Sequence, residues 1–167
     1  MNSDAKRIYR EAFGNDGDFC ERLFDVFGDI AEQLTADGKT VSLLFPLPCV
    51  LQTEKEKVPA KYIFAAATDS EKRGCGYMSE LIRRVCHDSE TFYFLRPANR
   101  DLIAFYEKFG FKEIKGIGSG EAFPYIDVSK PHKTLAGGAE EGGTFPLMYR
   151  YSAPIKLNEL HFGYSMF

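Results

Sequence analysis

A short glycine-containing turn between an apolar run and an amphipathic segment constrains this chain more than any other feature. The run from Tyr62 to Ala67 predicts a strand, and residues 77–86 carry apolar side chains at helical spacing. The turn between them ends in Arg73-Gly74-Cys75-Gly76. Glycine lets the backbone curl tightly, and the first N–H groups of a helix have no intrahelical partner. This order therefore predicts a site for an anion, of which phosphate and pyrophosphate are the usual examples.

Two glycines in a turn are also compatible with a connection that binds nothing. Comparison with the known phosphate-binding patterns excludes two types of phosphate site. A dinucleotide fold requires a third glycine where this chain has Ser79, and the sequence contains no P-loop string. The option that remains is a shorter loop that binds a pyrophosphate mainly through backbone N–H groups.

A second informative segment spans residues 91–111. It begins with a short apolar run from Thr91 to Leu95, which is typical of a strand, and Pro97 follows it. Apolar residues then recur at helical spacing as far as Phe109. Gly110 is placed to end that helix in a left-handed conformation. The segment therefore predicts a strand, a turn and a helix in this order.

Together these two segments resemble the GNAT superfamily, the GCN5-related N-acetyltransferases. The pyrophosphate loop of that superfamily, Arg/Gln-x-x-Gly-x-Gly/Ala, matches residues 71–76, with Glu71 as a departure at its first position. The later signature, Asn-x-x-Leu-Ile-x-Phe-Tyr-Glu-Lys-x-Gly-Phe, matches Asn99 to Phe111 with small deviations. The resemblance covers about residues 58–115 and is specific for fold and cofactor, but it says nothing about the acceptor.

The resemblance implies an α/β (α+β) fold in a single domain over residues 1–167. Its central sheet is expected to be mixed and mostly antiparallel, with helices on both faces and the pyrophosphate loop between strand 4 and the next helix. It also implies acetyl-CoA as co-substrate. The backbone at the strand end would hold the pantetheine arm, and N–H groups of the loop would bind the pyrophosphate. The cofactor-binding residues implied are Ala66, Ala67, Thr68, Arg73, Gly74, Cys75, Gly76 and Tyr77.

Two residues of the second segment have both a functional and a structural interpretation. Tyr106 matches the tyrosine that the family commonly uses as general acid toward the CoA thiolate, a role open to a phenol of pKa about 10. Because it lies on an apolar helical stripe, it also suits a place in the core. Asn99 matches a position that often binds CoA, and it suits a helix N-cap equally well. We interpret Tyr106 as the catalytic acid and include Asn99 among the cofactor-binding residues.

The sequence leaves two further points of chemistry open. Cys75 sits between the loop glycines as a small spacer, although a thiol at a helix N-terminus can have a lowered pKa. No carboxylate occurs in residues 62–67 or 91–95, where some family members place the general base. A water chain to a remote acid, or the terminal carboxylate of Phe167, would be the alternative. The general base is therefore not assigned.

Composition restricts the partners and the setting of the chain. With 167 residues, 44% hydrophobic and 27% charged, the chain suits one globular domain. The net charge of −3 argues against nucleic acid, and no apolar run is long enough to span a membrane. The four cysteines and three histidines have no metal-ligand spacing, so we expect no metal site. The start lacks a signal-peptide pattern, which favours a cytoplasmic, reduced protein.

The remaining segments give a coarse layout. Helices are expected at 5–13 and 18–27, and strands at 30–35, 40–52, 58–68, 111–117 and 144–152. Asp37-Gly38 predicts a hairpin, and Pro46 and Pro48 predict a bulge, edge or kink. The strand that usually starts the family fold is missing. The glycine-rich link 118–143 would be either a flap or disordered, and the aromatic tail 160–167 would pack on the core or on a partner subunit.

Three classes of function follow. The leading interpretation is an N-acetyltransferase that acts on a primary amine of a small molecule, with a homodimer as a further possibility of the superfamily. A peptide or protein acetyltransferase is the second, and it would need an open, acidic groove. The third is a CoA-binding protein with little catalysis. The sequence does not name the acceptor, because fold similarity does not transfer substrate.

Overall fold

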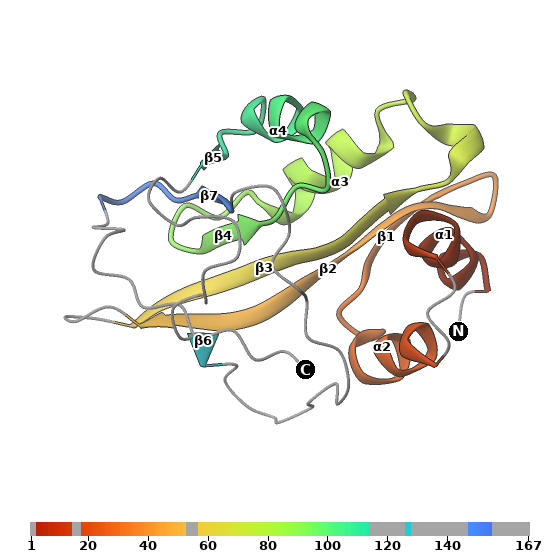
Figure 1. Ribbon diagram of the computed structural model, residues 1–167, viewed down its shortest axis with the longest axis horizontal. Coiled ribbons are helices and arrows are strands. Elements are labelled where there is room, and N and C mark those ends of the chain that lie inside the picture. The colour runs from red at the N-terminus through yellow and green to blue at the C-terminus, as the bar shows by residue number, and fades with distance from the viewer. Residues whose placement is uncertain (1–2, 15–17, 53–56, 114–125, 128–146, 155–167) are drawn as a thin grey trace. The chain divides into compact units, whose positions relative to one another are not determined.

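The computed structural model describes residues 3–14, 18–52, 57–113, 126–127 and 147–154, which form four α-helices, a short 3-10 helix and seven strands (Figure 1). The chain divides into two compact units. The first unit comprises Met1–Leu47 and Ile63–His87, and the second comprises Pro48–Tyr62 and Asp88–Phe167. Strands β2 (Lys39–Gln52) and β3 (Lys57–Thr68) run through both units. A single domain over residues 1–167 stays a prediction.

The first unit begins with two amphipathic helices, α1 (Ser3–Phe13) and α2 (Phe19–Phe27). Both helices were expected from the sequence, and each buries part of its apolar face. Glu21 of α2 forms ion pairs with Lys6 and Arg10 of α1, which tie the two helices together on their polar side. The fully buried or nearly buried residues of the pair are Ala5, Ile8, Tyr9, Cys20, Leu23 and Phe24.

The predicted hairpin joins β1 (Glu32–Ala36) to β2. Ala36 pairs with Lys39, and the two turn residues between them, Asp37 and Gly38, have φ of 53° and 75°. Positive φ at both positions is the type I′ geometry that matches the twist of paired strands. The register then shifts so that Val41 is an extra residue on β2, which makes a bulge.

The prolines of β2 lie at an edge position of this strand. The pairing of β2 with β1 extends to Leu44, and its pairing with β6 (Ile126–Asp127) begins at Val50. Pro46 and Pro48 fall between these two paired segments. This position suits a residue that has no N–H to donate to a ladder.

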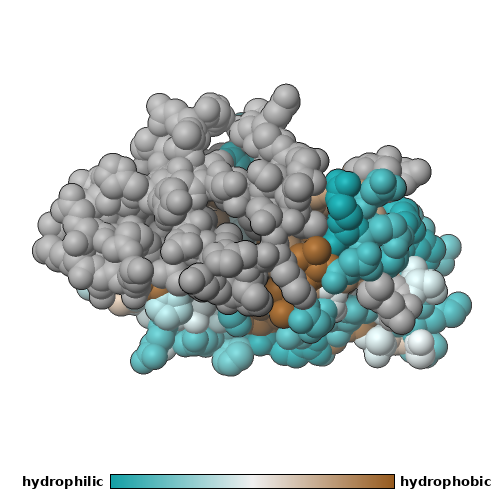
Figure 2. Space-filling view, turned by 90° about the horizontal axis from the view of Figure 1, so that it is seen from below, coloured by the Kyte–Doolittle hydropathy of each residue, from teal (hydrophilic) through white to brown (hydrophobic). Residues whose placement is uncertain are grey.

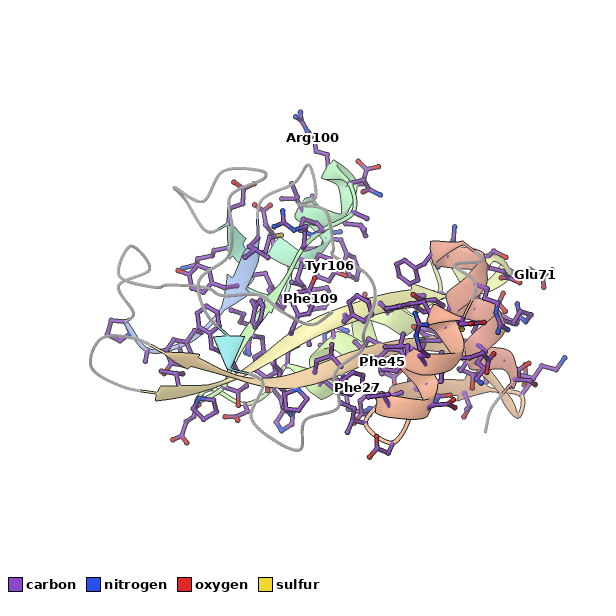
Figure 3. All side chains as sticks on the ribbon, turned by 60° about the horizontal axis from the view of Figure 1, so that its bottom comes forward. Phe27, Phe45, Glu71, Arg100, Tyr106 and Phe109 are labelled. Carbon is purple, nitrogen blue, oxygen red and sulfur yellow. The ribbon has the colours of Figure 1, made fainter. Side chains whose placement is uncertain are left out.

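Strand β3 leads into the 3-10 helix η1 (Ser70–Lys72) and then into α3 (Tyr77–Val85). In the first unit, α1 and α2 lie on one side of the strands and α3 lies on the other (Figures 1 and 3). The ring of Phe24 on α2 packs edge-on against Phe45 of β2 at 5.2 Å. Helix α3 buries Leu81, Ile82 and Val85, as its spacing predicted.

The second unit contains the remaining strands and α4 (Arg100–Glu107). Strand β4 (Phe92–Leu95) is parallel to β3, where Ala60 registers with Phe92. Strand β7 (Met148–Arg150) is antiparallel to β4, and β5 (Lys112–Glu113) is antiparallel to β7. The hydrogen-bonded order is β1-β2-β3-β4-β7-β5, with β6 paired to β2.

This architecture confirms the predicted fold class. The sheet is mixed, one of its registered pairings is parallel and the others are antiparallel, and helices flank it. The predicted pyrophosphate loop follows the third described strand rather than the fourth, because the first element of the described chain is α1. The strand β6 was not foreseen within the link 118–143. Apart from β6, that link and the tail 160–167 lie outside the described residues, as do the outer parts of the strands expected at 111–117 and 144–152.

Candidate functional site

The loop between β3 and α3 has the conformation that its two glycines predicted. Gly74 and Gly76 have φ of 79° and 85°, in the left-handed region that side-chain-bearing residues rarely adopt. A Cβ built on either glycine would meet no atom within 4 Å. Residues 73–76 are all exposed. These positions therefore need glycine for backbone conformation and not for lack of room.

The loop presents backbone donors at the start of α3. Gly76 is the N-cap residue, and the first intrahelical hydrogen bond runs from Glu80 N to Gly76 O at 3.0 Å. The N–H groups of the three preceding helical residues, 77–79, therefore have no acceptor within the helix. The helix dipole adds partial positive charge at the same place. An anion bound here would be held mainly by the backbone.

Cys75 lies between the two glycines and is exposed. Its thiol contacts the carbonyl oxygen of Arg73 at 3.9 Å. Within the described residues, Cys20 and Cys86 are also outside any disulfide bond, and both are buried. Cys75 therefore occupies the spacer position that the loop pattern predicted.

The end of β3 is irregular just before the predicted pantetheine-binding residues. Ala65 has φ of 50°, which is uncommon for a residue with a Cβ and marks local strain in the strand. Beyond it, Ala67 is buried, while Ala66 and Thr68 are half-buried. The sequence offered no signal for this distortion, because alanine is not a residue that favours positive φ.

Polar contacts from β2 fasten this strand end. The Ser42 hydroxyl donates to Ala67 O at 3.1 Å and lies 3.0 Å from Thr68 Oγ1. Asp69 N donates to Val41 O at 2.9 Å. In the sequence, Ser42 is distinguished from the apolar residues that follow it in β2 only by its hydroxyl, and its contact with the end of β3 was not predicted.

Asp69 connects α1 to the turn that precedes the glycine loop. One carboxylate oxygen accepts from Glu71 N at 3.0 Å, and the other pairs with Arg7 Nη2 at 2.5 Å. The hydrogen bond from Arg7, with that from Glu71 N, holds the pKa of the Asp69 carboxyl below its usual value. Asp69 and Glu11 in turn raise the pKa of the Arg7 guanidinium. An Asp at the start of a tight turn could have suggested the capping bond, but nothing in the sequence pointed to Arg7.

A polar cleft of about 520 Å³ lies beside this turn in the first unit. It is formed by α1, the β1–β2 hairpin and η1. Five carboxylates and three basic groups line it. The carboxylates are those of Asp4, Glu11, Asp37, Asp69 and Glu71, and the basic groups are those of Arg7, Lys39 and Lys72. Ala36, Val41 and Ser70 complete the lining. Over α1 and α2, the described surface seen in Figure 2 is mostly hydrophilic.

Helix α4 of the second unit holds the other two predicted site residues. Asn99 Oδ1 accepts from Leu102 N at 3.0 Å, so its capping role is confirmed. At the other end, Gly110 has φ of 83°; its N–H bonds Glu107 O at 3.0 Å, and Phe111 N approaches Tyr106 O at 3.4 Å. This pair of bonds is the Schellman arrangement expected of a glycine-terminated helix.

Tyr106 is 6% exposed and packs among aromatic rings. Its ring lies 5.2 Å from Phe105 and 5.8 Å from Phe111. Figure 3 shows Tyr106 and Phe109 on the inner side of α4, whereas Arg100 extends away from it. The structural interpretation of Tyr106 therefore holds, and its role as an acid stays a prediction.

The predicted site residues thus form two groups. Eight of them, Ala66, Ala67, Thr68, Arg73, Gly74, Cys75, Gly76 and Tyr77, lie on one continuous segment of the first unit. Asn99 and Tyr106 lie on α4 of the second unit. Within the described residues, no group of three or more metal-ligating side chains occurs, and no helix is long and apolar enough to cross a membrane.

The strand, the two-glycine loop and the helix N-terminus follow one another in the order that the resemblance predicted. The family model for the acetyltransferase (GNAT) domain matches residues 4–114, so the chain belongs to the GNAT family. A search of curated protein sequences found no match.

Solved structures agree on the fold. The chain is similar to a GCN5-related N-acetyltransferase from Anabaena variabilis, with a TM-score of 0.55 and 22% identity over 65% of this chain and 28% of that one. A second such protein, from Kribbella flavida, has a TM-score of 0.55 and 19% identity over 66% and 30%. A Trypanosoma brucei acetyltransferase has a TM-score of 0.53 and 16% identity over 69% and 88%. The chain therefore spans less than a third of the length of the first two.

Proposed function

We propose that this protein is an N-acetyltransferase that moves an acetyl group from acetyl-CoA directly to a primary amine of a small molecule. The observation that carries this proposal is the exposed loop with left-handed Gly74 and Gly76 at the N-terminus of α3. Membership of the GNAT family supports it, because that family uses acetyl-CoA. A cytoplasmic setting and a homodimer belong to the same proposal.

The residues of the first unit fit acetyl-CoA. The N–H groups around Gly74, Gly76 and the first turn of α3 have the open space and the dipole that a pyrophosphate needs. The exposed Arg73 adds positive charge beside them. The half-buried Ala66 and Thr68 leave the strand end accessible to the pantetheine arm. Because backbone groups would bind the pyrophosphate, we expect Glu71 in place of the usual Arg or Gln to change acetyl-CoA affinity little.

The reaction forms a C–N bond between the amine and the acetyl carbon and breaks the C–S bond of the thioester. The amine loses a proton, and the thiolate must gain one as it leaves. Backbone N–H groups at the end of β3 would stabilise the charge that develops on the carbonyl oxygen. Tyr106 would donate the proton to the thiolate. The base that accepts the proton of the amine is not assigned.

The polar cleft favours a second candidate, a peptide or protein acetyltransferase. The residues that line it carry five acidic and three basic groups. Asp69 to Lys72, which form one wall, directly precede the glycine loop. A surplus of negative charge beside a cofactor loop suits an acceptor with basic side chains. Screening amines and basic peptides in parallel distinguishes the two candidates.

The burial of Tyr106 favours a third candidate, a CoA-binding protein with little catalysis. A ring that is 6% exposed and packed against Phe105 and Phe111 would serve the core in any case. The variant Tyr106→Phe separates these possibilities. We expect kcat to fall about a hundredfold or more with little change in acetyl-CoA affinity, the effect of removing a general acid. Full turnover by this variant would leave Tyr106 with a packing role alone.

Acetyl-CoA binding measured by calorimetry tests the proposal. We expect micromolar binding by the natural sequence and none by Gly74→Asp/Gly76→Asp, because two carboxylates would repel the pyrophosphate. The matched control is Gly14→Asp/Gly38→Asp, since these glycines also have positive φ and open space at the Cβ. The control should bind normally. Absence of binding by the natural sequence would refute the transferase proposal.

A further inference from the structure

A buried hydroxyl group contacts the end of β3, where the pantetheine arm is proposed to bind. Ser42 on β2 is fully buried. Its Oγ lies 3.1 Å from the carbonyl oxygen of Ala67 and 3.0 Å from Oγ1 of Thr68. A buried hydroxyl normally needs such partners, because a buried polar group without a hydrogen bond destabilises the fold. These two contacts satisfy Ser42 and connect it to two of the predicted cofactor-binding residues.

The donors and acceptors of this chain of contacts can be assigned from chemistry alone. A carbonyl oxygen only accepts, so Ser42 donates its single proton to Ala67 O. Ser42 Oγ must then be the acceptor in its contact with Thr68. The proton of the Thr68 hydroxyl therefore points inward to Ser42, and the hydroxyl can offer only a lone pair to a ligand.

The neighbouring polar contacts of this strand end are made by atoms other than Thr68 Oγ1. The carbonyl oxygen of Thr68 is approached by Arg73 Nε at 3.4 Å. The next residue, Asp69, is anchored through its N–H to Val41 O at 2.9 Å. Thr68 itself is half-buried, whereas Ser42 is fully buried, so Thr68 is the member of the pair that a ligand can approach.

We propose that Thr68 Oγ1 accepts a hydrogen bond from an amide N–H of the pantetheine arm of acetyl-CoA, and that Ser42 is the positioning residue that turns the Thr68 hydroxyl into an acceptor. This inference rests on the proposed function, since it names a contact within the same site. The pantetheine arm carries two amide N–H groups, which are the donors such an oxygen requires. Ser42 touches no ligand and acts only through Thr68.

The test compares two ligands across four forms of the protein. The ligands are acetyl-CoA and the phosphoadenosine diphosphate half of CoA, which keeps the pyrophosphate and lacks the pantetheine arm. The forms are the natural sequence, Ser42→Ala, Thr68→Val and the double variant. We expect each single variant to weaken acetyl-CoA binding about three- to tenfold, as for one neutral hydrogen bond, and to leave binding of the nucleotide half unchanged.

The double variant separates a coupled pair from two independent structural effects. Because Ser42 acts through Thr68, adding Ser42→Ala to Thr68→Val should weaken acetyl-CoA binding no further. Thr68→Ser should rescue the affinity, since it retains the hydroxyl. Should Ser42→Ala fail to fold, as judged by circular dichroism, Thr68→Val against Thr68→Ser decides the question.

The outcomes distinguish this inference from the proposed function. Binding of neither ligand by the natural sequence would overturn both. The natural protein could bind both ligands while Ser42→Ala loses the same affinity for each. That result would mean that Ser42 has a general structural role, and it would overturn the inference but not the proposed function. The inference would also be overturned if the losses of acetyl-CoA affinity in Ser42→Ala and Thr68→Val multiplied in the double variant.

Discussion

The segment from β3 to α3 in the first unit and helix α4 in the second unit carry all the predicted site residues, but different contacts stabilise them. In the first unit, loop residues 73–76 are exposed, and polar contacts of Ser42 and Asp69 hold the strand end and the turn that precede them. In the second unit, Tyr106 is held by aromatic rings that surround it. Exposed side chains of a site that binds through backbone groups can therefore be substituted without loss of the site. A site residue in the core, in contrast, also stabilises the fold.

The largest effect on stability is expected for truncation of Tyr106. Tyr106→Ala removes a buried ring that contacts Phe105 and Phe111, so it should lower the free energy of unfolding by about 3–5 kcal/mol. Urea denaturation followed by circular dichroism measures this. Tyr106→Phe is the control, because it keeps the ring and should stay within about 1 kcal/mol of the natural protein. A loss below about 1 kcal/mol in Tyr106→Ala would mean that α4 is not packed through this ring.

A smaller effect is expected at the glycine loop. Gly76→Ala forces a Cβ into a left-handed conformation and should cost about 1–2 kcal/mol of stability. Gly76→Asn should cost less, because asparagine adopts positive φ more readily than alanine. No atom lies within 4 Å of the new Cβ, so crowding contributes nothing in the unliganded protein. Equal thermal unfolding of the alanine and asparagine variants would contradict this explanation.

The cap of α4 should contribute less again. Asn99→Ala removes the acceptor for Leu102 N and should cost about 1 kcal/mol in denaturation experiments. Asn99→Asp retains a capping oxygen and serves as the control. If Asn99→Asp matched the loss of Asn99→Ala, the capping bond would not be the source of the effect. A drop in acetyl-CoA affinity in Asn99→Ala at unchanged stability would instead support the predicted cofactor role.

The smallest effect is expected for the ion pair between Arg7 and Asp69. Because it is partly exposed, Arg7→Gln should cost no more than about 1 kcal/mol at pH 7. The pKa of Asp69 is lowered in the folded protein, so the pair stabilises the fold fully above the ordinary carboxyl pKa and loses its effect as the pH falls below about 4.

Unfolding measured at pH 7 and pH 3 tests this dependence. The difference between the natural protein and Arg7→Gln should shrink at pH 3. Arg22→Gln removes the same charge from an exposed position of α2 and should show no such change. A difference that is constant across this pH range would mean that Asp69 is not the partner that matters.

Much of the fold was predictable because its signals are local. The helices α1, α2 and α3 were located from apolar spacing to within a few residues, and the hairpin from Asp37-Gly38. The end of α4 followed from Gly110 for the same reason. In each case, the residues that determine the backbone conformation lie within one or two turns of each other in the chain.

The contacts that organise the candidate site were not predictable in this way. Arg7 and Asp69 are 62 positions apart, and Ser42 and Thr68 are 26 apart. Pairing of β6 with β2 joins residues still further apart. No pattern within a short window encodes such partners. The distorted conformation of Ala65 likewise has no local cause in the sequence.

Local chemistry therefore determined where the helices and the hairpin lie and which loop has the left-handed glycines, because glycine spacing and apolar periodicity act over a few residues. The arrangement of side chains around that loop depended on the folded chain. Ser42 orients Thr68, and Arg7 holds Asp69, only because β2 and α1 are packed beside the end of β3. The burial of Tyr106, in contrast, was already indicated by its place on an apolar helical stripe, because the rings that contact it, Phe105 and Phe111, are near in the sequence.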